Sequence, residues 1–245
     1  MDFNPTQQDV RSVQDILRRH LPAELTLDIL DVANYYPRSR CHRNEPKSYK
    51  ANDFWQPEPV ANVAGLYLTS TPTPRPDMGW QKVKVNRVTF NLRSADQGWA
   101  SFGGEDTYVN SHTWFDASIL RPWPNNSDDA PGPAAIGLEA SAIPQTFRTP
   151  ADARGFLQQH GWDFVEHDQG LTWKVHNNIT AQEKYANHRV DWVAGMETEV
   201  ENPDAMGDGR GFLERLTPGC IIALWARAEV SQTHQNATVT SSYNI

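Results

Sequence analysis

Two groupings of aromatic and polar residues have the types and spacing to hold a small ligand. In the first, Asp96, Gln97 and Trp99 lie in one short polar turn around Gly98. The carboxylate and the amide could hydrogen-bond a ligand while the indole stacks on it. In the structural alternative, Asp96 caps the turn, Gly98 supplies a positive φ, and Trp99 fills one end of the fold.

The second grouping is Trp114 and Asp116, which lie two residues apart in a strand-like segment. Alternate residues of a strand share a face and are about 6.6 Å apart, so a ring and a carboxylate could hold one ligand. Phe115 and Ala117 lie on the opposite face, which we expect to be the core. The alternative is a solvated outer face with Trp114 lying on it.

Further along, Trp225 and Arg227 alternate on one face of another predicted strand. A guanidinium there could clamp a carboxylate or stack on an aromatic ring. The structural alternative is an ion pair between Arg227 and an acidic neighbour. The predicted ligand-binding residues are therefore Asp96, Gln97, Trp99, Trp114, Asp116, Trp225 and Arg227.

Acid–base chemistry would need a carboxylate or a histidine with a suitable pKa. A histidine is a natural general base near neutral pH, although many histidines are hydrogen-bonded structural residues instead. His112 and Asp116 share a predicted face but are too far apart for a direct bond, and His188 and Asp191 point to opposite faces. The candidate catalytic residues are Asp96, His112, Asp116, His176 and His188.

No metal or cofactor is predicted. Glu105, Asp106 and Asp96 could supply oxygens to a calcium ion, but their spacing is not that of an EF-hand loop. Cys41 and Cys220 are far apart and form no CxxC pair, which argues against a zinc site or a disulfide framework. Dinucleotide, P-loop, HExxH and GxSxG motifs are all missing from the sequence.

The elements that must position these residues are mostly strands. Short apolar runs, several with a period of two, separated by long polar loops are typical of an antiparallel β-sandwich. A change of parity between Val85 and Val88 suggests a bulge or a bend near residues 86–87. Short helices are expected at 150–160 and 211–216, and a long loop at 121–145. The predicted strands are 60–68, 82–93, 112–120, 172–178, 188–193, 220–228 and 237–243.

The first 58 residues differ from the rest. Helical spacing of apolar residues over 7–36, interrupted at Leu21–Glu24, predicts a pair of helices, because proline is tolerated in a first helical turn. Residues 38–58 are polar and contain prolines, so we expect a connector or a loop lying on the main domain. The predicted organisation is a helical leader and connector at 1–58 and a β-sandwich domain at 59–245.

Composition excludes several classes of protein. The net charge of -8 argues against nucleic-acid binding. The sequence has no apolar stretch near the roughly 20 residues of a membrane helix. The polar start MDFNPTQQDV does not resemble a signal peptide, and the cysteine usage suits a reducing compartment. We therefore expect a cytoplasmic protein that contacts neither nucleic acid nor membrane.

Three pairs of segments carry a family resemblance: residues 93–99 with 113–117, 173–178 with 188–192, and 209–219 with 224–228. They resemble a largely uncharacterised fungal family with a short helical leader and a galactose-binding-like C-terminal region. The resemblance covers about 82–245 and implies a jelly-roll sandwich. After Ala228, residues 229–234 replace the Phe-Pro-Gly-Trp turn of the family. The family implies no catalytic residue.

Three functions remain open. The leading expectation is a sandwich module that binds a small organic or glycan ligand, since related folds more often bind than catalyse. The second is a cofactor-independent enzyme, a cyclase or isomerase of a fungal secondary metabolite, which needs a shaped aromatic pocket and one or two acid–base groups. The third is an adaptor that docks a protein partner through its N-terminal helices.

Overall fold

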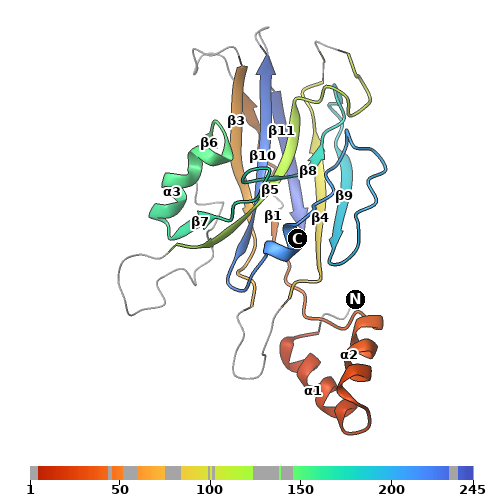
Figure 1. Ribbon diagram of the computed structural model, residues 1–245. Helices are drawn as coiled ribbons and strands as arrows, with labels where there is room; N and C mark the ends of the chain where they lie inside the picture. The colour runs from red at the N-terminus through yellow and green to blue at the C-terminus, as the bar shows by residue number, and fades with distance from the viewer. Residues whose placement is uncertain are drawn as a thin grey trace. The chain divides into compact units, whose positions relative to one another are not determined.

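The structure is a computed structural model of the whole chain (Figure 1). It describes residues 5–43, 46–51, 60–74, 84–98, 100, 103–123, 138, 146–231 and 237–244. Of residues 7, 60, 61, 230, 231 and 237–244 it describes the backbone alone. Contacts divide the chain into two compact units, Met1–Arg40 and Cys41–Ile245.

The first unit holds the predicted pair of helices, α1 (Gln7–Arg18) and α2 (Ala23–Val32). A capping box begins α1: the Thr6 hydroxyl accepts from the Asp9 amide at 3.2 Å, and the Asp9 carboxylate accepts from the Thr6 amide at 2.8 Å. Such reciprocal bonds satisfy amides that a helix start leaves unpaired. Pro22 precedes the first residue of α2, as the sequence indicated.

The second unit is mainly antiparallel β structure. Its first sheet has the order β1 (His42–Arg43), β11 (Ala237–Asn244), β4 (Arg87–Ala95) and β9 (Ala186–Val193), and β2 (Tyr49–Ala51) also pairs with β11. Residues 42–43 and 49–51, within the predicted connector, are thus strands of this sheet. β4 begins at Arg87, where the change of parity falls; residues 82 and 83 of the predicted strand lie outside the described part.

The second sheet has the order β6 (Thr146–Phe147), β3 (Val60–Thr69), β10 (Ile221–Ser231), β5 (Thr113–Pro122) and β7 (Trp162–Phe164). Along the same edge of β5, its first half pairs with β8 (Trp173–Asn177) and its second half with β7. β10 therefore lies between β3 and β5 (Figure 1). β7 was not predicted, because its three residues show too few alternations to detect.

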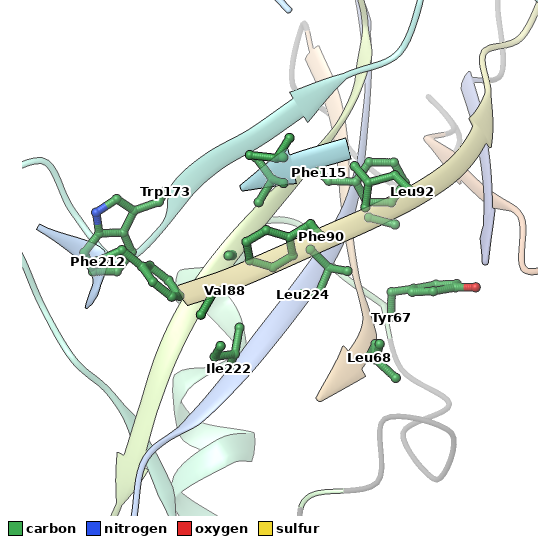
Figure 2. Close-up of a cluster of buried hydrophobic side chains, with 14 of the residues drawn as sticks. Tyr67, Leu68, Val88, Phe90, Leu92, Phe115, Trp173, Phe212, Ile222 and Leu224 are labelled. Atoms are coloured by element: carbon green, nitrogen blue, oxygen red, sulfur yellow. The ribbon is translucent and has the colours of Figure 1, made fainter. Parts of the chain in front are cut away.

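One hydrophobic cluster fills the space between the two sheets (Figure 2). Phe90 of β4 and Phe115 of β5 are fully buried in it, with Leu224 of β10. Trp192 meets Phe90 edge-on at a centroid distance of 5.0 Å. The predicted core face of β5 is thereby confirmed. Burial of so much apolar surface is the main stabilising term of the unit.

A second hydrophobic cluster covers the outer face of the second sheet. The short turn η4 (Pro150–Ala153) and the helix α3 (Arg154–Gln159) supply Ala153 and Leu157, in the predicted helical region. β7 supplies Phe164, which stacks on Trp225 at a centroid distance of 6.2 Å. This face is therefore covered rather than solvated over much of its length.

The remaining predicted elements agree with the structure. The helix α4 (Phe212–Arg215) lies within the predicted 211–216, and β8, β9 and β11 lie at or next to their predicted positions. Most of the predicted loop 121–145 lies outside the described residues. No helix in the described part of the chain combines the length and apolarity needed to span a bilayer.

Candidate functional site

Strands β5 and β10 bring three predicted site residues together on the outer face of the second sheet. Arg227 is directly opposite Trp114 in the strand register. Its Nη1 donates to Asp116 Oδ2 at 2.8 Å, and Trp114 Nε1 donates to the same oxygen at 3.1 Å. The guanidinium carbon lies 4.9 Å from the centroid of the Trp114 ring, within range of a cation–π interaction. Because alternate residues of a strand share a face, Trp114 and Asp116 of β5 and Arg227 of β10 form one cluster.

This ion pair is shielded from water. Asp116 is 5% exposed and Arg227 is 9% exposed, whereas the Trp114 indole is half-buried. Burial raises the pKa of Asp116, and the Arg227 guanidinium and the Trp114 hydrogen bond act in the opposite direction. Arg227 Nε is buried without a hydrogen-bond acceptor. A buried donor without a partner is costly, and native structures usually have a reason for one.

Lys174 adds a second cation beside this pair. It is opposite Asp116 in the register of β8 and β5, and its Nζ donates to the Asp204 carbonyl oxygen at 3.1 Å. Partial burial lowers the pKa of Lys174, while Asp204 and Asp116 oppose that shift. We refer to Trp114, Asp116, Lys174 and Arg227 together as the outer-face site.

Trp225 shares the face of Arg227, as its spacing predicted, but it is fully buried. Its Nε1 donates to Ser118 Oγ at 3.0 Å. Because Trp225 is packed beneath Phe164, it supports the outer-face site and presents no surface of its own.

Asp96 belongs to a different location, between the two sheets. Its Oδ1 accepts from Thr113 Oγ1 at 2.9 Å, and its Oδ2 accepts from the Ala181 amide at 2.9 Å. Asn178 Nδ2 also donates to Thr113 Oγ1, at 2.8 Å. These bonds join the end of β4, the start of β5 and the β8–β9 loop. Both carboxylate oxygens of Asp96 thus accept hydrogen bonds that hold the fold together.

The two predicted groupings do not converge on one site. Thr113, which holds Asp96, and Asp116 differ in parity along β5 and face opposite sides of the sheet. Gln97 is half-buried in the turn beside Asp96. Trp99 lies outside the described residues.

Two candidate histidines meet at the edge between the sheets. His176 of β8 and His188 of β9 stack with centroids 4.1 Å apart. Tyr108, from the loop before β5, lies edge-on to both rings, at 5.4 and 6.1 Å. His112 takes no part in these ring contacts; its carbonyl oxygen accepts from the Glu229 amide. We refer to His176, His188 and Tyr108 as the histidine cluster.

A β-bulge creates this cluster. Phe115 pairs with His176, but Asp116 pairs with Lys174, so Val175 is an extra residue on β8. In a regular strand Lys174 and His176 would share a face. The bulge instead turns His176 inward, while Lys174 points to the outer-face site.

Both imidazoles are poor bases here. Burial, together with neighbouring His176, lowers the pKa of His188 to about 4. Burial also lowers the pKa of His176, although the carbonyl of Asn177 opposes that shift. The two rings are therefore neutral at pH 7, and the buried His188 Nε2 has no hydrogen-bond partner.

Sequence reasoning missed Lys174 and Tyr108. Regular alternation would place Lys174 and His176 together, and nothing in the residues of β8 reveals the bulge. Tyr108 lies in a glycine-rich acidic loop without a periodic pattern. Its position depends on the two bonds that join Thr180 to Thr107 and Val109, at 2.7 and 2.9 Å.

The described residues contain no group of three or more His, Cys, Asp or Glu side chains placed to hold a metal ion. Comparisons with protein-family models and with curated proteins find no match. Neither comparison supports the expected membership of the fungal family. The fold is shown as mainly antiparallel β structure, in two sheets, with a pair of N-terminal helices.

Proposed function

We propose that the chain is a binding module, a jelly-roll sandwich of the galactose-binding-like kind, that holds a small polar organic or glycan-type ligand at the outer-face site. The observation that carries this proposal is the guanidinium of Arg227. It is buried and fixed by Asp116 and Trp114, yet its Nε has no acceptor. A ligand oxygen would supply one.

The chemistry of the site suits a hydroxyl-rich ring. Asp116 accepts hydrogen bonds, Arg227 and Lys174 donate them, and sugar hydroxyls do both. The half-buried indole of Trp114 offers an apolar surface on which the C–H face of a sugar or an aromatic ring can pack. Because Asp116 and Arg227 already hold each other in place, binding would cost little side-chain entropy.

Calorimetric titration of the full chain with a panel of mono- and disaccharides and small aromatic acids tests the proposal. We expect at least one saturating ligand, with affinity reduced about tenfold or more by Trp114→Ala. Tyr185→Ala is the matched control, because Arg93 lies 4.9 Å over Tyr185 in a pair of the same geometry elsewhere. The proposal fails if no member of the panel binds, or if both variants bind like the wild type.

A cofactor-independent cyclase or isomerase is a second candidate, and the histidine cluster favours it. His188 Nε2 is a buried, neutral ring nitrogen without a hydrogen-bond partner, next to the phenol of Tyr108, so it could hydrogen-bond a substrate rather than take up its proton. Chemical-shift mapping with any ligand that binds separates the two. Shifts at the Trp114 indole NH support the binding module, and shifts confined to the His176 and His188 rings support the enzyme.

A further inference from the structure

The exposed apolar side chains of the described residues are concentrated in the first unit. That unit contributes most of them although it is much the shorter of the two. Among the residues of the second unit that the structure describes, the exposed large apolar ones are Val109, Tyr185 and Met196. In the first they are Ile16, Leu25, Leu27, Ile29 and Val32.

Helix α2 has one buried face and a second, exposed apolar face. Its first contains Thr26 and Leu30, four residues apart and both buried. Its second contains Leu25, Ile29 and Val32, at positions i, i+4 and i+7, which share a face of a helix. These three are 49%, 43% and 86% exposed. We refer to them as the α2 stripe.

An acidic row runs beside the α2 stripe. Glu24, Asp28 and Asp31 have the same spacing, one residue earlier in each turn, and all three are exposed. Within the described part of the chain, no hydrogen bond or ion pair reaches their carboxylates. The helix sequence AELTLDILDV contains neither Lys nor Arg. The row is therefore uncompensated negative charge along one border of an apolar stripe.

We propose that the α2 stripe docks an amphipathic helix of a partner protein, with Lys or Arg residues bordering its own apolar stripe. An i, i+4, i+7 set of anchors is how helices commonly recognise one another, and bordering charges select the partner. A second copy of the chain fits less well. Its α2 would bring another acidic row, and both molecules carry a net charge of -8.

The test uses the full chain and two labelled synthetic peptides of about 18 residues, both helical with a leucine stripe. One has lysines beside the stripe, and the other has glutamates at the same positions. We expect the lysine peptide to bind, and the glutamate peptide to bind at least about tenfold more weakly, by fluorescence anisotropy. Higher salt should weaken binding of the lysine peptide.

Two sets of variants locate the surface. Ile29→Ser/Val32→Ser should weaken binding about tenfold, whereas Val109→Ser/Met196→Ser, matched exposed apolar residues of the other unit, should not. Asp28→Lys/Asp31→Lys should reverse the preference so that the glutamate peptide binds more tightly. This reversal distinguishes a specific surface from general adhesion of a basic peptide to an acidic protein.

Several outcomes would overturn the proposal. The lysine peptide could fail to bind, or bind equally well to both pairs of serine variants. Light scattering could show a dimer that Ile29→Ser/Val32→Ser dissociates, which would make a second copy the occupant. Hydroxyl-radical footprinting could show the stripe protected without peptide in a monomer, so that residues 41–245 cover it.

Discussion

The two faces of the second sheet are both covered, but they handle buried polar groups in different ways. On the outer face, Asp116 has an opposite charge 2.8 Å away on Arg227. On the inner face, His176 and His188 have each other, and burial lowers the pKa of both. One face thus keeps a charged pair and the other a neutral one. Burial is the largest cause of the pKa shift on both faces, and on the outer face the neighbouring Arg227 opposes it.

The largest change in the free energy of unfolding is expected from removing one member of the Asp116–Arg227 ion pair. Arg227→Met would leave the Asp116 carboxylate buried without its counter-ion, and loss of one member of such a pair costs about 3–5 kcal/mol. Urea unfolding monitored by circular dichroism measures the change in the free energy of unfolding.

The double variant Asp116→Leu/Arg227→Met is the control for this prediction. Replacing both members of a buried ion pair with apolar side chains is often neutral or stabilising, so it should recover most of the loss. A double variant as unstable as the single one would show that the two side chains contribute through packing rather than charge.

The second largest loss of stability is expected from adding a methyl group at Gly65, on the inner face of the second sheet. Gly65 of β3 lies against Tyr49 of β2, and an added Cβ would come within 1.8 Å of the Tyr49 Cε1. Tyr49 is 2% exposed and cannot move freely. Gly65→Ala should therefore destabilise the fold by about 2–3 kcal/mol, as overpacking does.

A double-mutant cycle checks this cause. In a Tyr49→Ala background the new methyl group would have space, so Gly65→Ala should cost much less than in the wild type. Additive effects of the two substitutions would mean that the contact between them is not the reason.

The neutral histidines make stability depend on pH. His188 has a pKa of about 4 in the folded chain, below the value near 6.5 of an unfolded one. The unfolded state therefore binds the proton first, and stability is full above pH 6.5 and falls from there towards pH 4. We expect a loss of about 2 kcal/mol over this range from His188.

His188→Phe keeps the stacking and removes the titrating group. It should flatten the decline of unfolding free energy between pH 6.5 and 4, measured by urea unfolding at several pH values. His160→Gln removes an exposed histidine and serves as the control. Equal slopes for His188→Phe and the wild type would contradict a neutral buried His188.

The contrast between the two faces also shows which structural features could be predicted from the sequence. Period two predicted β5 and the burial of Phe115 and Ala117, because apolar side chains on one strand face must find a core. The same pattern placed Trp114 with Asp116 and Trp225 with Arg227. It could not show that the strands carrying these pairs are neighbours, because strand order is not local information.

Two features of the site could not be predicted from the sequence, for physical reasons. Asp116 was predicted to face outward or into a cleft, and it is buried beside Lys174 and Arg227, which come from distant parts of the chain. The inward turn of His176 depends on one extra residue, Val175, which is as apolar as a regular core residue. Bulges change parity without changing composition.

The smallest expected effect concerns the cover of the outer face. Gly155 lies in α3, is exposed, and has no heavy atom within 4 Å of an added Cβ. Alanine is favoured over glycine in helices, because glycine loses more backbone entropy on folding. Gly155→Ala should therefore stabilise the fold by about 0.5 kcal/mol, the opposite sign from Gly65→Ala. Thermal unfolding of the two variants side by side measures this. A destabilising Gly155→Ala would mean that the added methyl group meets a contact at this position, contrary to the open space around it.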